Sequence, residues 1–283
     1  MAVRICAWLT ITVLLAGIMF RTFERNQVFH PYRELESQAA ELGRPFEEVT
    51  ITTGDGLKLH GWFFPCATNS VRVREVVLYC HGNGGNIGHR LGACGAVLET
   101  GVNVLLFDYR GYGRSEGRPT EEGTYLDAQA AYRWLTQRGF APAHIVAFGE
   151  SLGGAVAVEL ALRERLCGIV LQSSFTSIPD VGAELFPWLP VRWMATIHYN
   201  SRTKLEKVKV PVMIMHSRSD RLVGFNHAQA NFASANEPKL LWELAGDHND
   251  SLSDRKKFVE GVEKFLALIE STSRNTLLPP ASP

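Results

Sequence analysis

Apolar and polar residues follow one another along most of this chain in blocks that predict a β-sheet covered by helices. Runs without polar side chains, such as VVLY at 76–79, VLLF at 104–107 and CGIVL at 167–171, are typical of parallel strands buried on both faces. Longer stretches with a helical spacing of apolar residues separate these runs. Strands that alternate with helices in this way predict a three-layer α/β fold.

After residue 48 the pattern predicts eight strands and five main helices. The expected strands are Val49–Thr53, Leu57–Phe64, Val76–Cys80, Val102–Phe107, Ile145–Phe148, Gly168–Gln172, Val212–Met215 and Lys239–Glu243. The expected helices lie near Ile87–Glu99, Glu121–Gln137, Leu152–Arg163, Phe225–Ala235 and Arg255–Ile269. The first two strands are joined by GDG, a strong hairpin signal, so they should form an antiparallel edge on a mostly parallel central sheet.

The N-terminal segment has a different character. Residues 5–20, ICAWLTITVLLAGIMF, are apolar except for two threonines, and Arg4, Arg21 and Arg25 flank them. This run of 16 residues falls just short of the roughly 17–20 that a spanning helix needs. We expect residues 1–25 to be an uncleaved membrane anchor; a cleaved signal with export and a helix outside the membrane are the alternatives. Basic residues on both sides leave the orientation open.

The rest of the chain is expected to divide around one domain. Residues 26–48 should be a linker with a short amphipathic helix at 32–42, residues 49–270 the α/β domain, and residues 271–283 a disordered tail. Residues 174–208 interrupt the rhythm of strands and helices with ELFPWLPVRWM. This insertion is either a helix pair in the core or a small cap, whose Phe186, Trp188 and Trp193 are then candidates for lining a substrate pocket.

Composition excludes several classes of function. Lysine and arginine number 29, and so do aspartate and glutamate, which gives a formal net charge of zero without a basic stripe. A nucleic-acid partner is therefore not expected. The five cysteines are scattered, show no CxxC pattern and are expected to be mostly core thiols, with one disulfide left open. Neither a metal site nor an organic cofactor is predicted.

The densest chemical signal is GESLGG at 149–154, which lies between a predicted strand and a predicted helix. Such a G-x-S-x-G turn is so sharp that the serine adopts strained backbone angles, and glycines two residues on either side of Ser151 avoid collisions. The turn would lift the Ser151 hydroxyl above the sheet edge at a helix N-terminus. The stretch therefore predicts a nucleophile rather than a plain connection.

A serine nucleophile needs a base and an orienting acid, which follow it in the order serine, acid, histidine in this fold. The predicted strand at 212–215 leads into a loop with Asp220, and the strand at 239–243 leads into a loop with His248. We predict a triad of Ser151, Asp220 and His248. Alternative candidates are His216 and His81 for the base, and Asp247 and Asp250 for the acid.

A glycine-rich loop after an earlier strand, YCHGNGGN at 79–86, supplies the second half of an oxyanion hole. We expect the main-chain N–H groups of Asn83 and Leu152 to stabilise the oxyanion. A phosphate-binding loop is disfavoured because the GxxxxGK[ST] lysine is missing. In the stretch at 107–123, Asp108 and Arg110 are expected to brace the oxyanion loop, and Tyr109 is a candidate for lining the pocket.

These motifs together resemble the serine hydrolases of the α/β-hydrolase superfamily. The resemblance is closest to small, often membrane-anchored members that include protein depalmitoylases and the fungal Bem-type proteins. It rests on YCHGNGGNIG, LLFDYRGYGRSEG, GESLGGAVA, SSFTSI, PVMIMHSRSDRLV and GDHND, between residues 49 and 269. It implies Ser151, Asp220 and His248 as nucleophile, acid and base. Ser217 departs from the family's usual glycine, and only Cys6 lies in the anchor, which weakens a strict depalmitoylase assignment.

The expected activity is hydrolysis of carboxylic esters or thioesters of acyl, lipid-like substrates near a membrane, by way of an acyl-enzyme. A peptidase or amidase on the same fold is the alternative, and a non-catalytic binding protein is disfavoured because all three triad residues are present. The sequence leaves the natural substrate and the oligomeric state open.

Overall fold

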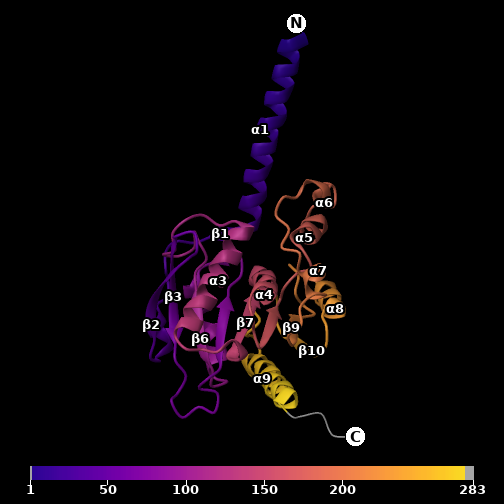
Figure 1. Cartoon of the computed structure of the whole chain (residues 1–283). Helices are drawn as coiled ribbons and strands as arrows, with labels where there is room; N and C mark the ends of the chain where they lie inside the picture. The colour runs from indigo at the N-terminus through magenta and orange to yellow at the C-terminus, as the bar shows by residue number, and fades with distance from the viewer. Residues whose placement is uncertain (1, 278–283) are drawn as a thin grey trace.

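A twisted eight-stranded β-sheet forms the centre of the computed structural model, which describes residues 2–277 (Figure 1). In spatial order the strands are β10 (Lys239–Leu244), β9 (Val212–Ser217), β8 (Gly168–Gln172), β7 (Ile145–Glu150), β4 (Val76–Cys80), β6 (Asn103–Phe107), β3 (Lys58–Phe64) and β2 (Glu47–Thr52). The six strands from β10 to β6 are parallel, and β3 and β2 add the antiparallel hairpin edge. The predicted α/β fold is therefore confirmed.

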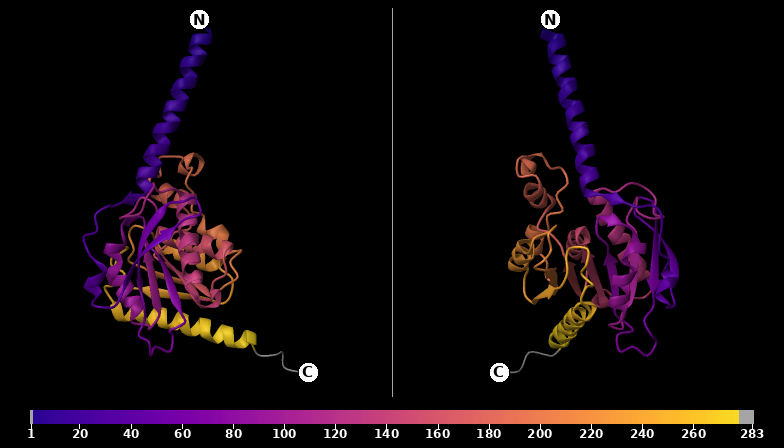
Figure 2. Two further views of the ribbon diagram at one scale, coloured as in Figure 1. Left: turned by 60° about the vertical axis from the view of Figure 1, so that its left-hand side comes forward. Right: turned by 180° about the vertical axis from the view of Figure 1, so that it is seen from behind.

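Helices cover both faces of the sheet, as its apolar strands require. One core contains side chains of α3 (Glu121–Gln137), α4 (Leu152–Arg163) and α8 (Phe225–Ser234). The other contains side chains of α2 (Leu91–Leu98) and α9 (Arg255–Leu277). Strand β4 contributes Leu78 to the first core and Tyr79 to the second, because successive side chains of a strand point to opposite faces. The layers are visible from the side in Figure 2.

The insertion at 174–208 folds into three short helices on the edge where the parallel strands end. They are α5 (Ile178–Leu185), α6 (Val191–Met194) and α7 (Ser201–Leu205). Pro179 lies in the first turn of α5, where its missing N–H costs nothing, and the Ser177 hydroxyl accepts a hydrogen bond from the Asp180 N–H. We call residues 174–208 the cap.

Helix α1 (Ala2–Val28) extends away from the sheet beside the cap (Figures 1 and 2). The sequence predicts a membrane anchor over residues 1–25. Within residues 2–277, the structure contains no helix that is long and apolar enough to cross a membrane.

The segment after α1 corrects the prediction of a linker helix. Residues 32–42 contain only a 3₁₀ turn at Ala39–Leu42, and β1 (His30–Pro31) pairs with β5 (Gly84–Gly85) instead. The reason is that Asn86 Nδ2 donates hydrogen bonds to the carbonyls of Tyr32 and Glu34, which fixes this stretch against the loop at 84–86. Val28 and Phe29 are buried in the core, so the domain extends N-terminal to residue 49.

Two remaining predictions concern the C-terminus and the cysteines. Helix α9 continues to Leu277, so the first residues of the predicted disordered tail are helical, while residues 278–283 lie outside the described part. Four cysteines are free thiols, as expected for the core: Cys66, Cys80, Cys94 and Cys167. Burial raises the pKa of Cys80 to about 12, which keeps this thiol protonated and inert.

Candidate active site

Ser151 occupies the sharp turn between β7 and α4. Its φ of 51° and ψ of −114° lie in a region that side-chain-bearing residues rarely adopt. The turn is held from both sides: the Ser151 N–H donates to the Gln172 carbonyl at 2.8 Å, and the Ser174 hydroxyl donates to the Ser151 carbonyl at 2.8 Å. Strained backbone that its surroundings fix in this way is typical of functional sites.

Glycines make this turn possible. A Cβ atom at Gly149 would overlap the Gly153 main chain, and a Cβ atom at Gly153 would overlap the Cys80 carbonyl. Strand β7 and helix α4 therefore approach each other, and β4, as closely as a backbone without side chains allows. The two glycines serve packing, and the packing fixes the Ser151 hydroxyl at the sheet edge.

Gly153→Ala should consequently destabilise the protein by about 3 kcal/mol or more, because the overlap involves backbone that cannot move without distorting the sheet. Thermal and urea unfolding of the two proteins would measure the difference. Gly54→Ala is the matched control: an added Cβ meets nothing within 4 Å there, and we expect a change below about 0.5 kcal/mol. Equal stability of the two variants would contradict this account of the turn.

The structure brings Ser151, His248 and Asp220 together from three loops at the carboxyl ends of β7, β10 and β9. His248 Nε2 lies 3.2 Å from Ser151 Oγ, and His248 Nδ1 lies 2.7 Å from Asp220 Oδ2. A carboxylate only accepts hydrogen bonds, so the Nδ1–H donates to Asp220 and the Nε2 lone pair faces the serine hydroxyl. This arrangement can take a proton from Ser151.

Asp220 is buried among donors. Its Oδ1 accepts hydrogen bonds from the N–H groups of Leu222 and Val223, at 3.0 and 2.8 Å. Burial acts to raise the pKa of Asp220, but hydrogen bonds from His216, His248 and the Val223 N–H outweigh it and hold the pKa below its usual value. The carboxylate is therefore ionised at neutral pH and can stabilise a histidinium next to it.

His216, a rival for the base in the sequence, contacts the acid of the triad instead of the serine. Its Nε2 lies 2.8 Å from the Val223 carbonyl and 3.3 Å from Asp220 Oδ2, so it steadies the acid loop from below. The spacing of four residues between His216 and Asp220 is the signal that could have revealed this contact. His216 lies on the side of Asp220 away from Ser151 in the hydrogen-bond chain, and it does not contact the serine.

The other rivals for base and acid have different partners. Asp247 pairs with Arg221, whose Nε lies 2.7 Å away, and accepts the His248 main-chain N–H rather than the ring proton. His81 is fully buried, its Nδ1 lies 2.7 Å from the Gly82 carbonyl, and its ring packs on Tyr109. Burial lowers the pKa of His81 to about 3, so the ring is neutral.

Asn83 and Leu152, the predicted oxyanion donors, both line the same cavity as Ser151 and His248. Leu152 is the first residue of α4, so its N–H has no intrahelical acceptor. Asn83 is fixed by the segment after α1: its side chain donates to the Val28 carbonyl, and its carbonyl accepts from the His30 N–H and the Tyr112 hydroxyl.

Buried polar residues hold the loop that carries Asn83. Asp108 accepts the Ile87 N–H at 3.0 Å and so braces the loop as expected. Arg110 does not; it pairs with Asp127 and Asp55 and ties the neighbouring turn to α3 instead. The expectation that Arg110 braces the oxyanion loop is therefore corrected: it supports the turn at 107–123 through Asp55 and Asp127, which lie on either side of that stretch in the sequence.

An ion pair that the sequence analysis missed connects the nucleophile strand to the same loop. Arg90 Nε lies 2.8 Å from a carboxylate oxygen of Glu150, the residue before Ser151, and Arg90 Nη2 donates to the Gly84 carbonyl at 2.8 Å. The Tyr79 hydroxyl donates to Glu150 at 3.1 Å. Glu150 occupies a variable position of the G-x-S-x-G motif and Arg90 lies 60 positions before it, so no sequence signal indicated the pair.

A cavity of about 970 Å³ opens at Ser151, between the end of α1 and the cap. One side of it is apolar and is formed mainly by Phe175, Ile178, Val181, Leu185, Phe186, Leu222 and Val223. A second group of lining residues is more polar and includes His30, Tyr32, His89, Arg90 and Glu150. We call the apolar group the apolar arm and this second group the polar arm; Ser151 and His248 line the same cavity.

Of the four residues predicted to line the pocket, one does so and three do not. Phe186, which follows α5, lines the cavity. Tyr109 does not, because it is fully buried beneath the site and its hydroxyl donates to the His81 carbonyl. Trp188 and Trp193 do not either: they are 74% and 92% exposed and lie on the outer surface of the cap. Prolines on either side of Trp188 turn the chain away from the cavity after Phe186.

Among the described residues, no group of three or more histidine, cysteine, aspartate or glutamate side chains is placed to hold a metal ion. The side chains of the site offer a hydroxyl, an imidazole and a carboxylate. The main chain adds the two amides that are the candidates for binding an oxyanion.

Comparison with known proteins gives a consistent assignment. A family model for the alpha/beta hydrolase fold matches residues 75–210. An uncharacterised protein of Mycobacterium tuberculosis is 38% identical over 246 residues, covering 86% of this chain and 87% of its own. Protein bem46 of Schizosaccharomyces pombe is 29% identical over 229 residues, which is 77% of this chain and 76% of its own. An esterase of Pyrococcus furiosus has the same fold, with a TM-score of 0.70 and 24% identity over 85% of this chain and 97% of the esterase.

Proposed function

Because the chain belongs to the α/β-hydrolase family, we propose that it is a serine hydrolase that cleaves carboxylic ester or thioester bonds of acyl substrates. One observation carries the proposal: the continuous hydrogen-bond chain from Ser151 Oγ through the imidazole of His248 to Asp220. Burial of the ionised Asp220 is costly, and its hydrogen bond with His248 offsets part of that cost while it orients the imidazole.

In the proposed mechanism His248 Nε2 removes the Ser151 proton while Oγ bonds to the substrate carbonyl carbon. The carbonyl oxygen becomes an oxyanion that accepts hydrogen bonds from the N–H groups of Asn83 and Leu152. The proton then passes from His248 to the leaving alcohol or thiol as the ester bond breaks, which leaves an acyl group on Ser151. Water, deprotonated by His248, attacks this acyl-enzyme and releases the acid.

The apolar arm of the cavity is proposed to hold the acyl chain and the polar arm the leaving group. Val181→Trp should fill the apolar arm and lower kcat/KM for octanoyl or longer p-nitrophenyl esters about tenfold, while the acetyl ester changes little. Val71→Trp is the control, since Val71 is 96% exposed in the loop between β3 and β4. Equal loss for all chain lengths would place the acyl group elsewhere.

Turnover of matched esters, thioesters and amides by the full chain would test the reaction class. Esters and thioesters should react far faster than the amide, and preferential amide cleavage would support the peptidase alternative. We also propose that the apolar N-terminal segment associates the enzyme with a membrane, with residues 174–208 as a cap over the site.

A further inference from the structure

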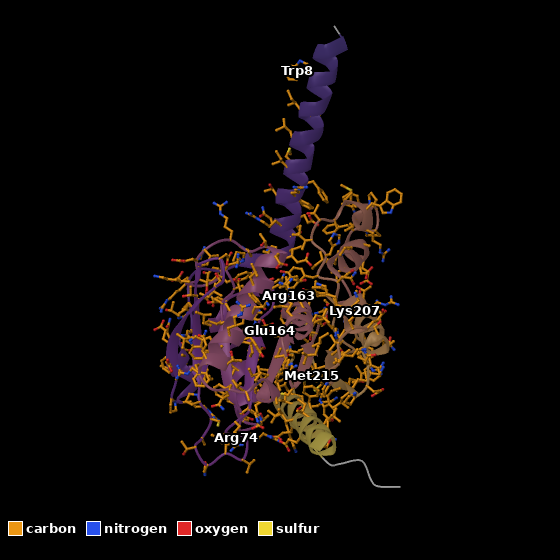
Figure 3. All side chains as sticks on the ribbon, viewed as in Figure 1. Trp8, Arg74, Arg163, Glu164, Lys207 and Met215 are labelled. Carbon is orange, nitrogen blue, oxygen red and sulfur yellow. The ribbon has the colours of Figure 1, made fainter. Side chains whose placement is uncertain are left out.

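Large exposed apolar side chains gather at one end of the molecule. Six are on α1: Trp8, Ile11, Leu15, Ile18, Met19 and Phe23. Five more belong to the cap and the adjacent loop: Leu185, Trp188, Trp193, Met194 and Leu222. We call these eleven residues the apical face. Figures 1 and 2 show α1 and helices α5 and α6 at this same end, and Figure 3 labels Trp8 near the tip of α1.

A buried hydrogen-bond cluster joins the two halves of the apical face. Glu24, near the end of α1, is only 8% exposed. Its carboxylate accepts hydrogen bonds from the Thr196 N–H at 2.7 Å, the Ile197 N–H at 3.0 Å and the Thr196 hydroxyl. Because Thr196 and Ile197 follow α6 directly, α1 and the cap are held in a fixed relation. A surface that contacts one must lie close to the other.

The charge on α1 selects an anionic partner. Its sequence contains three arginines, Arg4, Arg21 and Arg25, and a single acidic residue, Glu24, whose carboxylate is turned inward to the cap. On the cap, Arg192 is exposed beside Trp193 but pairs with Asp180, whose Oδ1 lies 3.1 Å from its Nε, so the excess positive charge comes from α1. Arginines next to apolar residues are attracted to anionic lipid headgroups, each by about 1 kcal/mol near the surface.

The chemistry of the apical face also matches a lipid surface better than water or a protein core. Residues 5–20 are apolar around the whole circumference of a helix, which is typical of helices in lipid or in a protein core. Tryptophan is enriched at the boundary between headgroups and acyl chains, where its ring is half wet. Figures 1 and 2 show α6, which contains Trp193, level with the lower part of α1, the depth at which such a boundary would meet the cap.

We propose that the apical face binds an anionic lipid bilayer through two contacts, α1 and the tryptophans of the cap, so that the cavity opens toward the lipid. The cavity is lined in part by Gln27 and Val28 at the end of α1 and by Val181 and Leu185 of α5, so it borders both contacts. An acyl chain leaving the bilayer would meet the apolar arm first. The inferred substrates are acyl lipids or acylated groups at the membrane, and this part of the proposal rests on the proposed hydrolase function. The proposal that the apical face binds lipid does not depend on that function.

Brominated lipids, which quench only tryptophans that enter the bilayer, test the cap contact. In the full-length Trp8→Phe variant, five of the six tryptophans remain, and two of these are Trp188 and Trp193. With vesicles of brominated phosphatidylcholine and phosphatidylglycerol we expect quenching of about two fifths of the emission. Adding Trp188→Phe and Trp193→Phe should abolish it, since Trp62 is buried and Trp134 and Trp242 pack against the core from α3 and β10.

Activity provides a second readout. Trp188→Ala/Trp193→Ala should lower hydrolysis of a long-chain ester presented in vesicles about tenfold, the effect of a 1.4 kcal/mol loss of binding. Hydrolysis of soluble p-nitrophenyl acetate should be unchanged, because neither side chain lines the cavity. Val71→Ala/Val73→Ala is the matched control: these residues are exposed in the loop that carries Arg74, at the opposite end of the molecule in Figure 3.

Three results would overturn the lipid contact: no quenching in the Trp8→Phe variant, quenching that survives loss of both cap tryptophans, or a soluble dimer that the double alanine variant dissociates. The last would identify a second copy of the chain as the occupant of the face. If wild-type protein cleaves no ester at all while quenching is as expected, the proposed hydrolase function fails and the lipid contact stands.

Discussion

Replacement of Ser151 by alanine is expected to lower the rate of ester hydrolysis about 10⁵- to 10⁶-fold. The variant keeps the cavity and the two proposed amide donors but loses the oxygen that would form the acyl-enzyme. Residual turnover above water would come only from the oxyanion hole and from binding. Initial rates with a soluble p-nitrophenyl ester, measured for the full chain in detergent, would quantify the loss.

Ser251→Ala is the matched control for this experiment. Ser251 lines the same cavity, three residues beyond His248, but Ser151 is the serine within hydrogen-bond distance of the imidazole. We expect the control to retain activity within about threefold, the range typical of a contact outside the reacting chain. Loss of activity in Ser251→Ala with retention in Ser151→Ala would refute the elbow as the source of the nucleophile.

Asp220→Asn should lower kcat about 10⁴-fold with little change in KM. An amide at this position presents a donor to His248 Nδ1, which favours the tautomer with its proton on Nε2. That proton would face the Ser151 hydroxyl, and the imidazole could no longer act as the base. Stopped-flow or steady-state kinetics at several substrate concentrations would separate kcat from KM.

Asp247→Asn is the matched control, because Asp247 is a neighbouring acid that the sequence leaves as an alternative candidate for the acid of the triad. Its carboxylate faces Arg221 and the His248 main chain, not the imidazole. We expect less than about a tenfold loss of kcat, since no hydrogen bond in the reacting chain changes. Comparable losses in the two variants would mean that the loop at 246–250 rearranges when substrate binds.

The sequence was sufficient to predict the sheet because its strands are continuous apolar runs. Such a run is stable only where both faces of the strand are covered, as they are between two layers of helices. The sequence also indicated which loops converge at the site, since parallel strands bring their carboxyl ends to one edge. Ser151, Asp220 and His248 could be selected together for this reason, although none of the three is distinctive alone. The order along the chain supplied the information that composition lacks.

The contacts that the sequence did not reveal depend on three-dimensional proximity between remote segments. The sequence predicts a helix at 32–42, but Asn86 donates hydrogen bonds to the carbonyls of Tyr32 and Glu34, which a helix would use internally. The ion pair of Glu150 and Arg90 also joins two segments that are distant in the sequence. On the cap, the choice between Phe186 inside and Trp188 outside follows from where a proline turns the chain, which a pattern of aromatic residues does not encode.

The segment at 28–32 also affects the choice of a soluble form. It contacts Asn83 through the Val28 carbonyl and the His30 N–H, so it belongs to the catalytic unit rather than to a dispensable anchor. Removal of residues that precede Glu24 leaves these contacts intact. Removal of residues up to 33 would take away the support of the oxyanion loop.

The central claim, that Ser151 forms a covalent acyl-enzyme, is tested most directly by finding the residue that a fluorophosphonate modifies. The full chain would be labelled, digested and analysed by tandem mass spectrometry. The account predicts a single adduct on Ser151, in the peptide that contains GESLGG, and its disappearance in the His248→Ala variant. An adduct on another residue, or undiminished labelling without His248, would contradict it.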